Sequence, residues 1–283
     1  MNKPVVHPLT QAHLTAFMKQ PSHALLMSGP TGSGKQTMAL QLAAQLLHTD
    51  KLDNHPYVRL ITPEAGKAIS IEVVRDLEHF LSLKVPNLQA VNRVVVITDS
   101  HLLTTEAQNA LLKTLEEPPD STVILLTTAH EQALLPTIRS RVQTVSVKRP
   151  DQAALQAHFT EQGHDTKRIE QTYTMTGGLP GLMQALLTDD EHPLTAATAT
   201  ARTLLSQTTF ERLQLVDELS KNRQLAQDTL FILQQMAHVS LQRATGQAAK
   251  RWQQILTASY EASEQLTNNA QPKLVLDNLM LHF

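Results

Sequence analysis

Residues 29–37 of the chain read Gly29-Pro30-Thr31-Gly32-Ser33-Gly34-Lys35-Gln36-Thr37. They follow a short apolar run at 24–27 and precede a helix-forming segment. Glycines at this spacing let successive backbone N–H groups face a phosphate, and the helix start adds partial positive charge to that of the lysine. The order of strand, loop and helix predicts a phosphate-binding P-loop and makes an ordinary glycine turn the less favoured alternative.

One position departs from the P-loop pattern. A Ser or Thr hydroxyl normally follows the lysine and contributes a ligand to magnesium, but here the residue is Gln36. Thr37 lies about 100° further around the helix and should not point at the same ion. ATP is therefore the candidate ligand of a loop whose magnesium position is degraded, and the sequence favours phosphate binding over hydrolysis.

Apolar runs of strand length recur through the first half of the chain. They cover residues 24–27, 57–61, 94–97, 122–126 and 142–147. Amphipathic segments lie between them, at roughly 35–48, 71–84 and 105–117. The last of these has a capping box formed by Thr105 and Gln108 as a candidate start, and Pro118-Pro119 ends it. Alternating strands and helices predict an α/β domain with a parallel sheet and crossover helices.

The rest of the chain is predicted to be helical. Twelve of the 14 prolines lie at or before Pro180, and the stretch 194–271 holds a single glycine, Gly246. We therefore predict three domains, which are the α/β domain at 1–150, a small helical unit at 151–208 and a second helical domain at 209–283.

A second half of an ATPase site would need two acids at the end of another strand. Thr98-Asp99 follows the run 94–97 and offers one carboxylate. A polar strand end without function is the alternative interpretation of Asp99. The candidate cofactor-binding residues also include Thr127, which follows the run 122–126, and the full set is Gly29, Gly32, Ser33, Gly34, Lys35, Gln36, Thr37, Asp99 and Thr127.

Composition excludes several classes of protein. The 24 Lys and Arg against 26 Asp and Glu give a formal net charge of -2, so no global basic field attracts nucleic acid. Without cysteine there is no disulfide, zinc-thiolate site or iron–sulfur cluster. The 13 histidines show no paired ligand spacing, and no metal site is expected. No apolar run reaches the length of about 18 residues that a membrane span needs, so we expect a cytoplasmic protein without membrane contact.

Three longer stretches carry a family resemblance. They are Asp99 to Thr104, Ala107 to Pro119 and Leu134 to Arg141. Together they closely resemble the bacterial clamp-loader AAA+ subunits of DNA polymerase III, and the eroded P-loop and Thr98-Asp99 resemble the delta-prime type in particular. The likeness extends to residues 23–26, 55–67, 177–181 and 274–283.

The resemblance implies an AAA+ P-loop domain, a helical lid and an all-α collar that binds other subunits. It implies a subunit that assists ATP-dependent loading of the sliding clamp onto primed DNA without hydrolysing ATP itself. Its partners would be the gamma/tau and delta subunits, with the clamp and primed DNA reached through the assembly. The arginine of the family's Ser-Arg-Cys motif matches Arg141, which would act on a neighbour's ATP.

Departures from the family pattern accompany this likeness. Residues 48–54 fill the place of a four-cysteine zinc module, so no zinc is expected. The thiol of Ser-Arg-Cys is replaced by Val142, and Leu182 stands where motor subunits have a lid arginine.

Several alternatives stay open. The nearest is an ATP-hydrolysing gamma/tau-type motor subunit, followed by an unrelated P-loop kinase or metabolic ATPase and by a scaffold that binds no nucleotide. For Arg141 the alternative is a surface arginine that bridges to a carboxylate such as Glu116 or Glu117. The apolar carboxyl-terminal tail could fill its own domain core instead of an interface.

Overall fold

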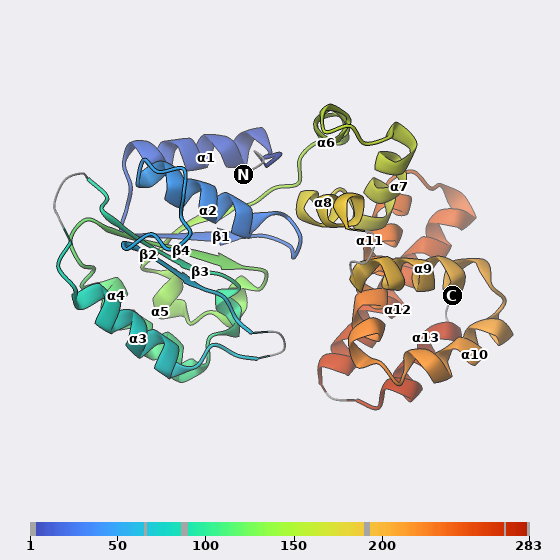
Figure 1. The fold of residues 1–283 in the computed structure, drawn as a ribbon. Coiled ribbons are helices and arrows are strands. Elements are labelled where there is room, and N and C mark those ends of the chain that lie inside the picture. The colour runs from blue at the N-terminus through green and yellow to red at the C-terminus, as the bar shows by residue number, and fades with distance from the viewer. Residues whose placement is uncertain (1–3, 65–66, 86–89, 190–192, 269, 282–283) are drawn as a thin grey trace. The chain divides into compact units, whose positions relative to one another are not determined.

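The computed structural model describes residues 4–64, 67–85, 90–189, 193–268 and 270–281. Residues 65–66 and 282–283, which belong to the family-like stretches 55–67 and 274–283, lie outside the described residues. The chain forms two compact units, Met1–Pro150 and Asp151–Phe283 (Figure 1).

The first unit is built on a parallel sheet with the strand order β2-β3-β4-β1-β5. The strands are β1 (Ala24–Ser28), β2 (Val58–Ile61), β3 (Arg93–Ile97), β4 (Thr122–Thr128) and β5 (Gln143–Ser146). Every residue of β3 and β4 is buried, as expected for strands with helices on both faces. This confirms the α/β domain with a parallel sheet.

Helices cover both faces of this sheet (Figure 1). They are α1 (Pro8–Lys19), α2 (Lys35–Leu46), α3 (Ile71–Ser82) and α4 (Thr105–Glu116). Leu25 and Met27 of β1 pack with α1 and α2, whereas Leu26 between them packs with α3 and α4. Because strand side chains alternate between faces, one short strand contributes to both apolar cores.

The capping box predicted from Thr105 and Gln108 is wrong. The cap of α4 is Thr104, whose hydroxyl accepts a hydrogen bond from the Ala107 N–H at 3.2 Å. Gln108 is buried and donates through Nε2 to the carbonyl oxygens of Leu103 (3.1 Å) and Ala133 (3.2 Å). Its Oε1 accepts from the Leu135 N–H at 2.8 Å. Gln108 therefore joins α4 to two loops.

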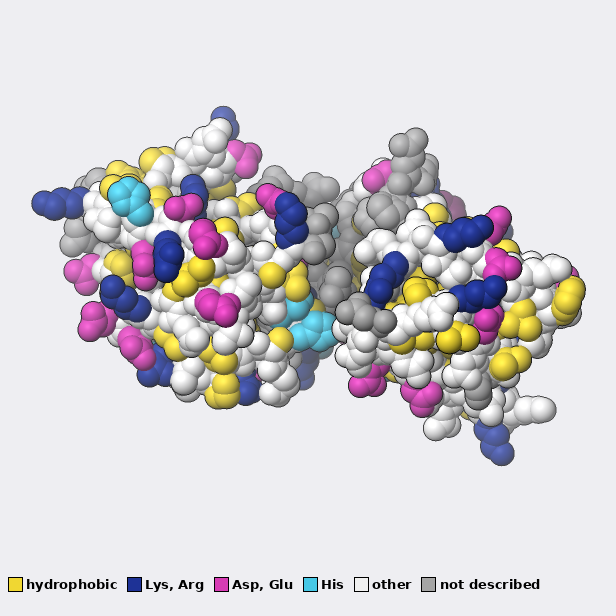
Figure 2. All heavy atoms as spheres, turned by 90° about the horizontal axis from the view of Figure 1, so that it is seen from below, with side chains coloured by type: hydrophobic (Ala, Val, Ile, Leu, Met, Phe, Trp, Pro, Cys, Tyr) yellow, Lys and Arg dark blue, Asp and Glu magenta, His cyan; other side chains and the backbone are white. Residues whose placement is uncertain are grey.

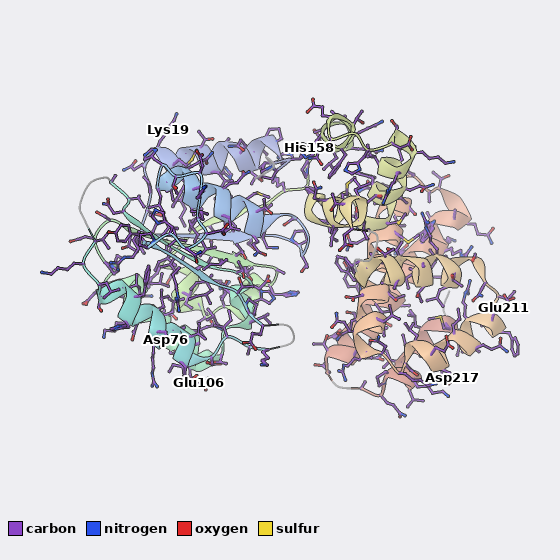
Figure 3. All side chains as sticks on the ribbon, viewed as in Figure 1. Lys19, Asp76, Glu106, His158, Glu211 and Asp217 are labelled. Atoms are coloured by element: carbon purple, nitrogen blue, oxygen red, sulfur yellow. The ribbon has the colours of Figure 1, made fainter. Side chains whose placement is uncertain are left out.

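The second unit is helical. Its helices are α6 (Gln152–Glu161), α7 (Thr166–Thr176), α8 (Pro180–Thr188), α9 (Pro193–Ser206), α10 (Thr209–Leu219), α11 (Arg223–Leu241), α12 (Gly246–Thr267) and α13 (Pro272–Leu281). Glu211 closes a capping box with Thr208 at the start of α10 (Figure 3). No helix in the described ranges is long and apolar enough to cross a membrane.

One apolar core joins helices on both sides of the predicted boundary at residue 208. Leu204 of α9 shares it with Leu230 and Leu233 of α11 and with Leu276 of α13. Residues 151–283 thus form a single compact unit, and the division into 151–208 and 209–283 stays a prediction.

The glycine cluster at 177–181 turns the chain between α7 and α8. Gly177 and Gly178 have left-handed φ values of 65° and 70°. A Cβ atom on Gly178 would lie 2.6 Å from Cε2 of Tyr173. Only glycine meets both conditions, so this cluster has a structural explanation.

Candidate functional site

The candidate residues converge at the carboxyl edge of the parallel sheet. The P-loop connects β1 to α2, Asp99 follows β3, and Thr127 lies near the end of β4 beside β1. The Asp99 N–H donates to the Thr127 hydroxyl at 3.1 Å, and the Ser100 hydroxyl donates to the Thr127 carbonyl at 2.9 Å. The structure therefore brings Asp99 and Thr127 together, at the edge of the sheet where open α/β sheets bind their ligands.

The P-loop backbone requires its glycines. Gly32 and Gly34 have φ values of 78° and 83°, in the left-handed region, and Gly34 is the cap residue of α2. A Cβ atom on Gly29 would lie 3.0 Å from the Val147 carbonyl oxygen. These constraints shape a loop that can expose backbone N–H groups to an anion.

Lys35 lies inside this loop with 5% of its surface exposed. Its Nζ donates to the carbonyl oxygens of Gly29 (2.7 Å) and Pro30 (2.8 Å). Burial lowers the pKa of Lys35 to about 8, and the nearby Asp99 carboxylate opposes that shift. The lysine is therefore protonated at neutral pH and turned toward its own loop.

The residues at the loop fit a phosphate. The buried hydroxyl oxygen of Ser33 has no hydrogen-bond partner among the described residues, which is a cost unless a ligand satisfies it. Together with the Lys35 ammonium it offers polar contacts that suit a nucleotide phosphate.

The same residues do not fit a magnesium ion. Gln36 and Thr37 are exposed on α2, and the buried Thr98 hydroxyl donates to the Ile61 carbonyl at 3.3 Å. Within the described ranges, no group of three or more His, Asp or Glu side chains could hold a metal ion. Neither a hydroxyl after the lysine nor a second acid beside Asp99 is present.

Two histidines at this edge were not among the predicted site residues. His101 lies in a 3-10 turn, Ser100–Leu102, and His130 follows β4; their ring centroids are 5.2 Å apart in an edge-to-face arrangement. Burial lowers the pKa of His101, with an opposing effect from Asp99 and smaller lowering effects from His130 and Lys35. The sequence signal for these two histidines was their position, because each follows the carboxyl end of a strand within four residues.

Arg141 lies outside this cluster, just beyond the short helix α5 (Pro136–Arg139). Its Nη2 forms an ion pair with Oε1 of Glu116 at 2.8 Å, and its Nη1 donates to the Thr137 carbonyl at 3.0 Å. The side chains of Arg141 and Glu116 are 36% and 50% exposed. The carboxylate bridge considered as the alternative role is therefore present. Exposed pairs contribute only about 0–1 kcal/mol, so the guanidinium can leave this contact at little cost.

Leu182 belongs to the second unit. It is buried at the start of α8, where it packs with Leu179 and Leu194. Its role is apolar packing, and it brings no cation to a phosphate.

Charge is mixed on the face of the first unit that carries α3 and α4. Figure 2 shows Lys and Arg side chains interspersed there with Asp and Glu side chains. A surface of this kind, on a chain with a formal net charge of -2, gives no broad attraction for the DNA backbone.

A family model described as "DNA polymerase III, delta subunit" matches residues 9–151, about half of the chain. The chain belongs to this family. The match spans the whole P-loop domain from α1 to the end of β5, including the loop and Arg141.

Curated relatives are DNA polymerase III subunits. Subunit delta' of Pseudomonas aeruginosa is 34% identical over 187 residues, which are 59% of this chain and 56% of that protein. Subunit tau of Bacillus subtilis is 30% identical over 160 residues, which are 49% of this chain and 28% of that protein. The matched part spans about half the length of the delta' relative. The likeness to the delta-prime type is confirmed.

A solved structure shows the same fold along nearly the whole chain. It is a DNA polymerase III gamma subunit-related protein from Thermotoga maritima, with a TM-score of 0.55 and 21% identity, and it covers 96% of this chain and 97% of that chain. The predicted AAA+ fold, a parallel α/β domain followed by a helical region, is confirmed.

Proposed function

We propose that this chain acts as the delta-prime subunit of a replicative clamp loader and assists ATP-dependent loading of a sliding clamp onto primed DNA. Its direct partners are the gamma/tau and delta subunits, and the clamp and DNA are reached through the assembly in the cytoplasm. Membership of the DNA polymerase III delta subunit family and the AAA+ fold support this proposal.

The chain does not hydrolyse ATP at its own P-loop. The observation that carries this part is the loss of both metal-binding elements: Gln36 replaces the hydroxyl after Lys35, and Thr98 directs its hydroxyl to the Ile61 carbonyl. In phosphoryl transfer the metal ion neutralises charge that develops on the phosphate oxygens. A site without its ligands lacks the largest part of that stabilisation.

We also propose that ATP binds at this loop. Gly29, Gly32 and Gly34 shape the loop, and Ser33, Lys35 and the start of α2 contact the phosphates. Asp99 and Thr127 lie at the same edge of the sheet, beside the loop. A bound nucleotide would satisfy the unpartnered Ser33 hydroxyl and replace the carbonyl contacts of Lys35.

Arg141 acts in trans, on the ATP of a neighbouring subunit. Its side chain is partly exposed and is tied to its own chain by an ion pair and by contacts within one turn. A planar guanidinium can donate two parallel hydrogen bonds to phosphate oxygens, and such a finger is worth roughly a thousandfold or more in rate. This role does not require the chain to hydrolyse ATP at its own P-loop, because hydrolysis there and the action of Arg141 on a neighbour use different residues.

In this proposal, residues 151–208 form the lid and residues 209–283 form the collar. Large apolar side chains are exposed on collar helices, with Phe210 of α10 at 71%, Tyr260 of α12 at 56%, and Leu274 and Leu281 of α13 both at 65%. Exposed apolar groups favour contact with other subunits where they form a contiguous patch.

A gamma/tau-type motor subunit is the alternative. The tau relative supports it, but Gln36 and Thr98 argue against it because a motor needs its own magnesium ligands. Steady-state hydrolysis by the purified chain separates the two proposals. We expect a background rate that Lys35→Ala does not change; hydrolysis that disappears in Lys35→Ala would support the motor subunit instead.

A further inference from the structure

We propose that Glu116 regulates Arg141 by competing with the neighbouring subunit's ATP for the same guanidinium. This inference rests on the proposed trans role of Arg141. It names Glu116 as a positioning residue that sets how readily the arginine leaves its own chain.

The geometry gives both terminal nitrogens of Arg141 a partner in cis. Nη2 pairs with Glu116 Oε1 at 2.8 Å. Nη1 donates to the Thr137 carbonyl at 3.0 Å and lies 3.4 Å from the Ser140 hydroxyl oxygen. Two-point recognition of a phosphate uses a pair of N–H groups of the same fork. A phosphate held by both terminal nitrogens therefore competes with these cis partners for the guanidinium.

Glu116 competes with a phosphate for Arg141 more strongly than Thr137 and Ser140 do, because it carries a negative charge and they offer only neutral oxygens. A carboxylate 2.8 Å from Nη2 neutralises much of the arginine's charge and repels an approaching triphosphate. Because the pair is exposed, salt screens it. The pair therefore hinders the release of Arg141 but does not prevent it. Removing the negative charge should favour the contact with the phosphate.

The chain contains a matched control beside this residue. Glu116 is the last residue of α4, and Glu117 is its exposed cap residue; the ion pair of Arg141 is with Glu116. Glu116→Gln and Glu117→Gln remove the same charge from adjacent positions. Only the first removes the carboxylate that contacts Arg141.

The test uses the full chain in a loader reconstituted with its gamma/tau and delta partners from the same organism. ATP hydrolysis is measured with and without clamp and primed DNA, and kcat and KM are separated. Binding of a fluorescent, non-hydrolysable ATP analogue gives a second readout. The variants are Glu116→Gln, Glu117→Gln, Arg141→Ala and the double variant Glu116→Gln/Arg141→Ala, each checked for assembly by gel filtration.

We expect Glu116→Gln to tighten analogue binding, lower KM and raise the unstimulated rate by about two- to fivefold, the range set by an exposed ion pair. The difference from wild type should shrink as salt is raised. Glu117→Gln should match wild type, and Glu116→Gln should have no further effect in the Arg141→Ala background. If Glu116→Gln does not assemble, Glu116→Asp, which keeps the charge with a shorter reach, should show a smaller change in the same direction.

Different failures have different meanings. If Arg141→Ala lowers the rate but Glu116→Gln equals Glu117→Gln, reduces the rate, or acts equally without Arg141, competition by Glu116 is wrong and the trans role stands. If Arg141→Ala assembles and leaves the stimulated rate unchanged, the proposed trans role fails, and this inference fails with it.

Discussion

At the carboxyl edge of the sheet, the side chains that suit phosphate binding differ from those that hydrolysis would need. Ser33 and Lys35 are buried within a loop in which Gly32 and Gly34 have left-handed backbones. Gln36, one residue further on, is exposed and has no hydroxyl, and the Thr98 hydroxyl is directed to the Ile61 carbonyl. The groups that suit a phosphate are present, and a hydroxyl after Lys35 and a second acid beside Asp99, which would hold its metal ion, are not.

At the proposed ATP site, the lowered pKa of Lys35 predicts that binding depends on pH. The ammonium is charged below its pKa of about 8 and neutral above it, so the attraction for phosphate is present at low pH and lost as pH rises through that value. We expect the dissociation constant for ATP, measured by fluorescence titration, to rise about three- to tenfold between pH 7 and pH 9. Lys35→Ala should bind weakly at both values. An affinity of the wild-type chain that is independent of pH would contradict this role for the lysine.

Gln108 should be among the most sensitive polar residues of the first unit. Gln108→Leu keeps the volume but leaves the Leu103 and Ala133 carbonyls and the Leu135 N–H without this partner. We expect a loss of about 2–4 kcal/mol in the free energy of unfolding, measured by urea denaturation. Asn109→Leu, at the adjacent exposed position, should change it by less than about 0.5 kcal/mol. Equal effects of the two substitutions would argue against the buried network.

The P-loop residues were predictable from the sequence, whereas Gln108 was assigned the wrong role and His101 and His130 were not recognised. The P-loop is contiguous, so spacing alone reveals it. Gln108 instead bonds to residues 25 and 27 positions away, and the histidine pair joins the ends of two different strands. Contacts between segments that are distant in sequence depend on the order of strands in the sheet, which apolar runs do not specify.

At the scale of elements, strands were easier to predict than helix starts. The run 94–97 corresponds to β3 at Arg93–Ile97, and the run 142–147 corresponds to β5 at Gln143–Ser146. β3 is buried throughout and therefore apolar, which makes it easy to predict, whereas β5 at the edge of the sheet is mostly exposed and its run is apolar only in part. The start of α4 was misassigned by one residue, because adjacent threonines, Thr104 and Thr105, offer the same cap chemistry.

The turn between α7 and α8 gives a prediction at the element scale. Gly178→Ala adds a Cβ 2.6 Å from the Tyr173 ring at a φ of 70°, whereas Gly163→Ala meets nothing within 4 Å at a φ of 88°. We expect Gly163→Ala to cost about 1 kcal/mol for its backbone alone and Gly178→Ala about 1–2 kcal/mol more. Thermal denaturation measures both.

A second substitution isolates the contact with the ring. In a Tyr173→Ala background, Gly178→Ala should cost no more than Gly163→Ala does in the wild type. If the excess cost persists without the ring, the close contact is not its cause.

At the scale of the whole chain, the core of the first unit is complete within residues 1–150. Both apolar clusters of the sheet draw on residues of this range, while α9 shares its core with α11 and α13. We therefore expect a fragment of residues 1–150 to be soluble and to unfold cooperatively in urea. A fragment of residues 1–208 should aggregate, because it exposes Ala197, Ala201 and Leu204 of α9. A soluble, monomeric 1–208 fragment would show that lid and collar fold separately.

The central claim is that this chain contributes an arginine to a neighbour's ATP and needs no hydrolysis of its own. The most direct test compares Lys35→Ala with Arg141→Ala in the reconstituted loader, with clamp and primed DNA present, by the steady-state rate of ATP hydrolysis. We predict that Lys35→Ala retains the wild-type rate and that Arg141→Ala assembles normally but loses at least the share of the rate that the neighbouring site contributes, because a finger is worth roughly a thousandfold or more at the site it serves. The reverse pattern, with a rate lost in Lys35→Ala and kept in Arg141→Ala, would contradict it.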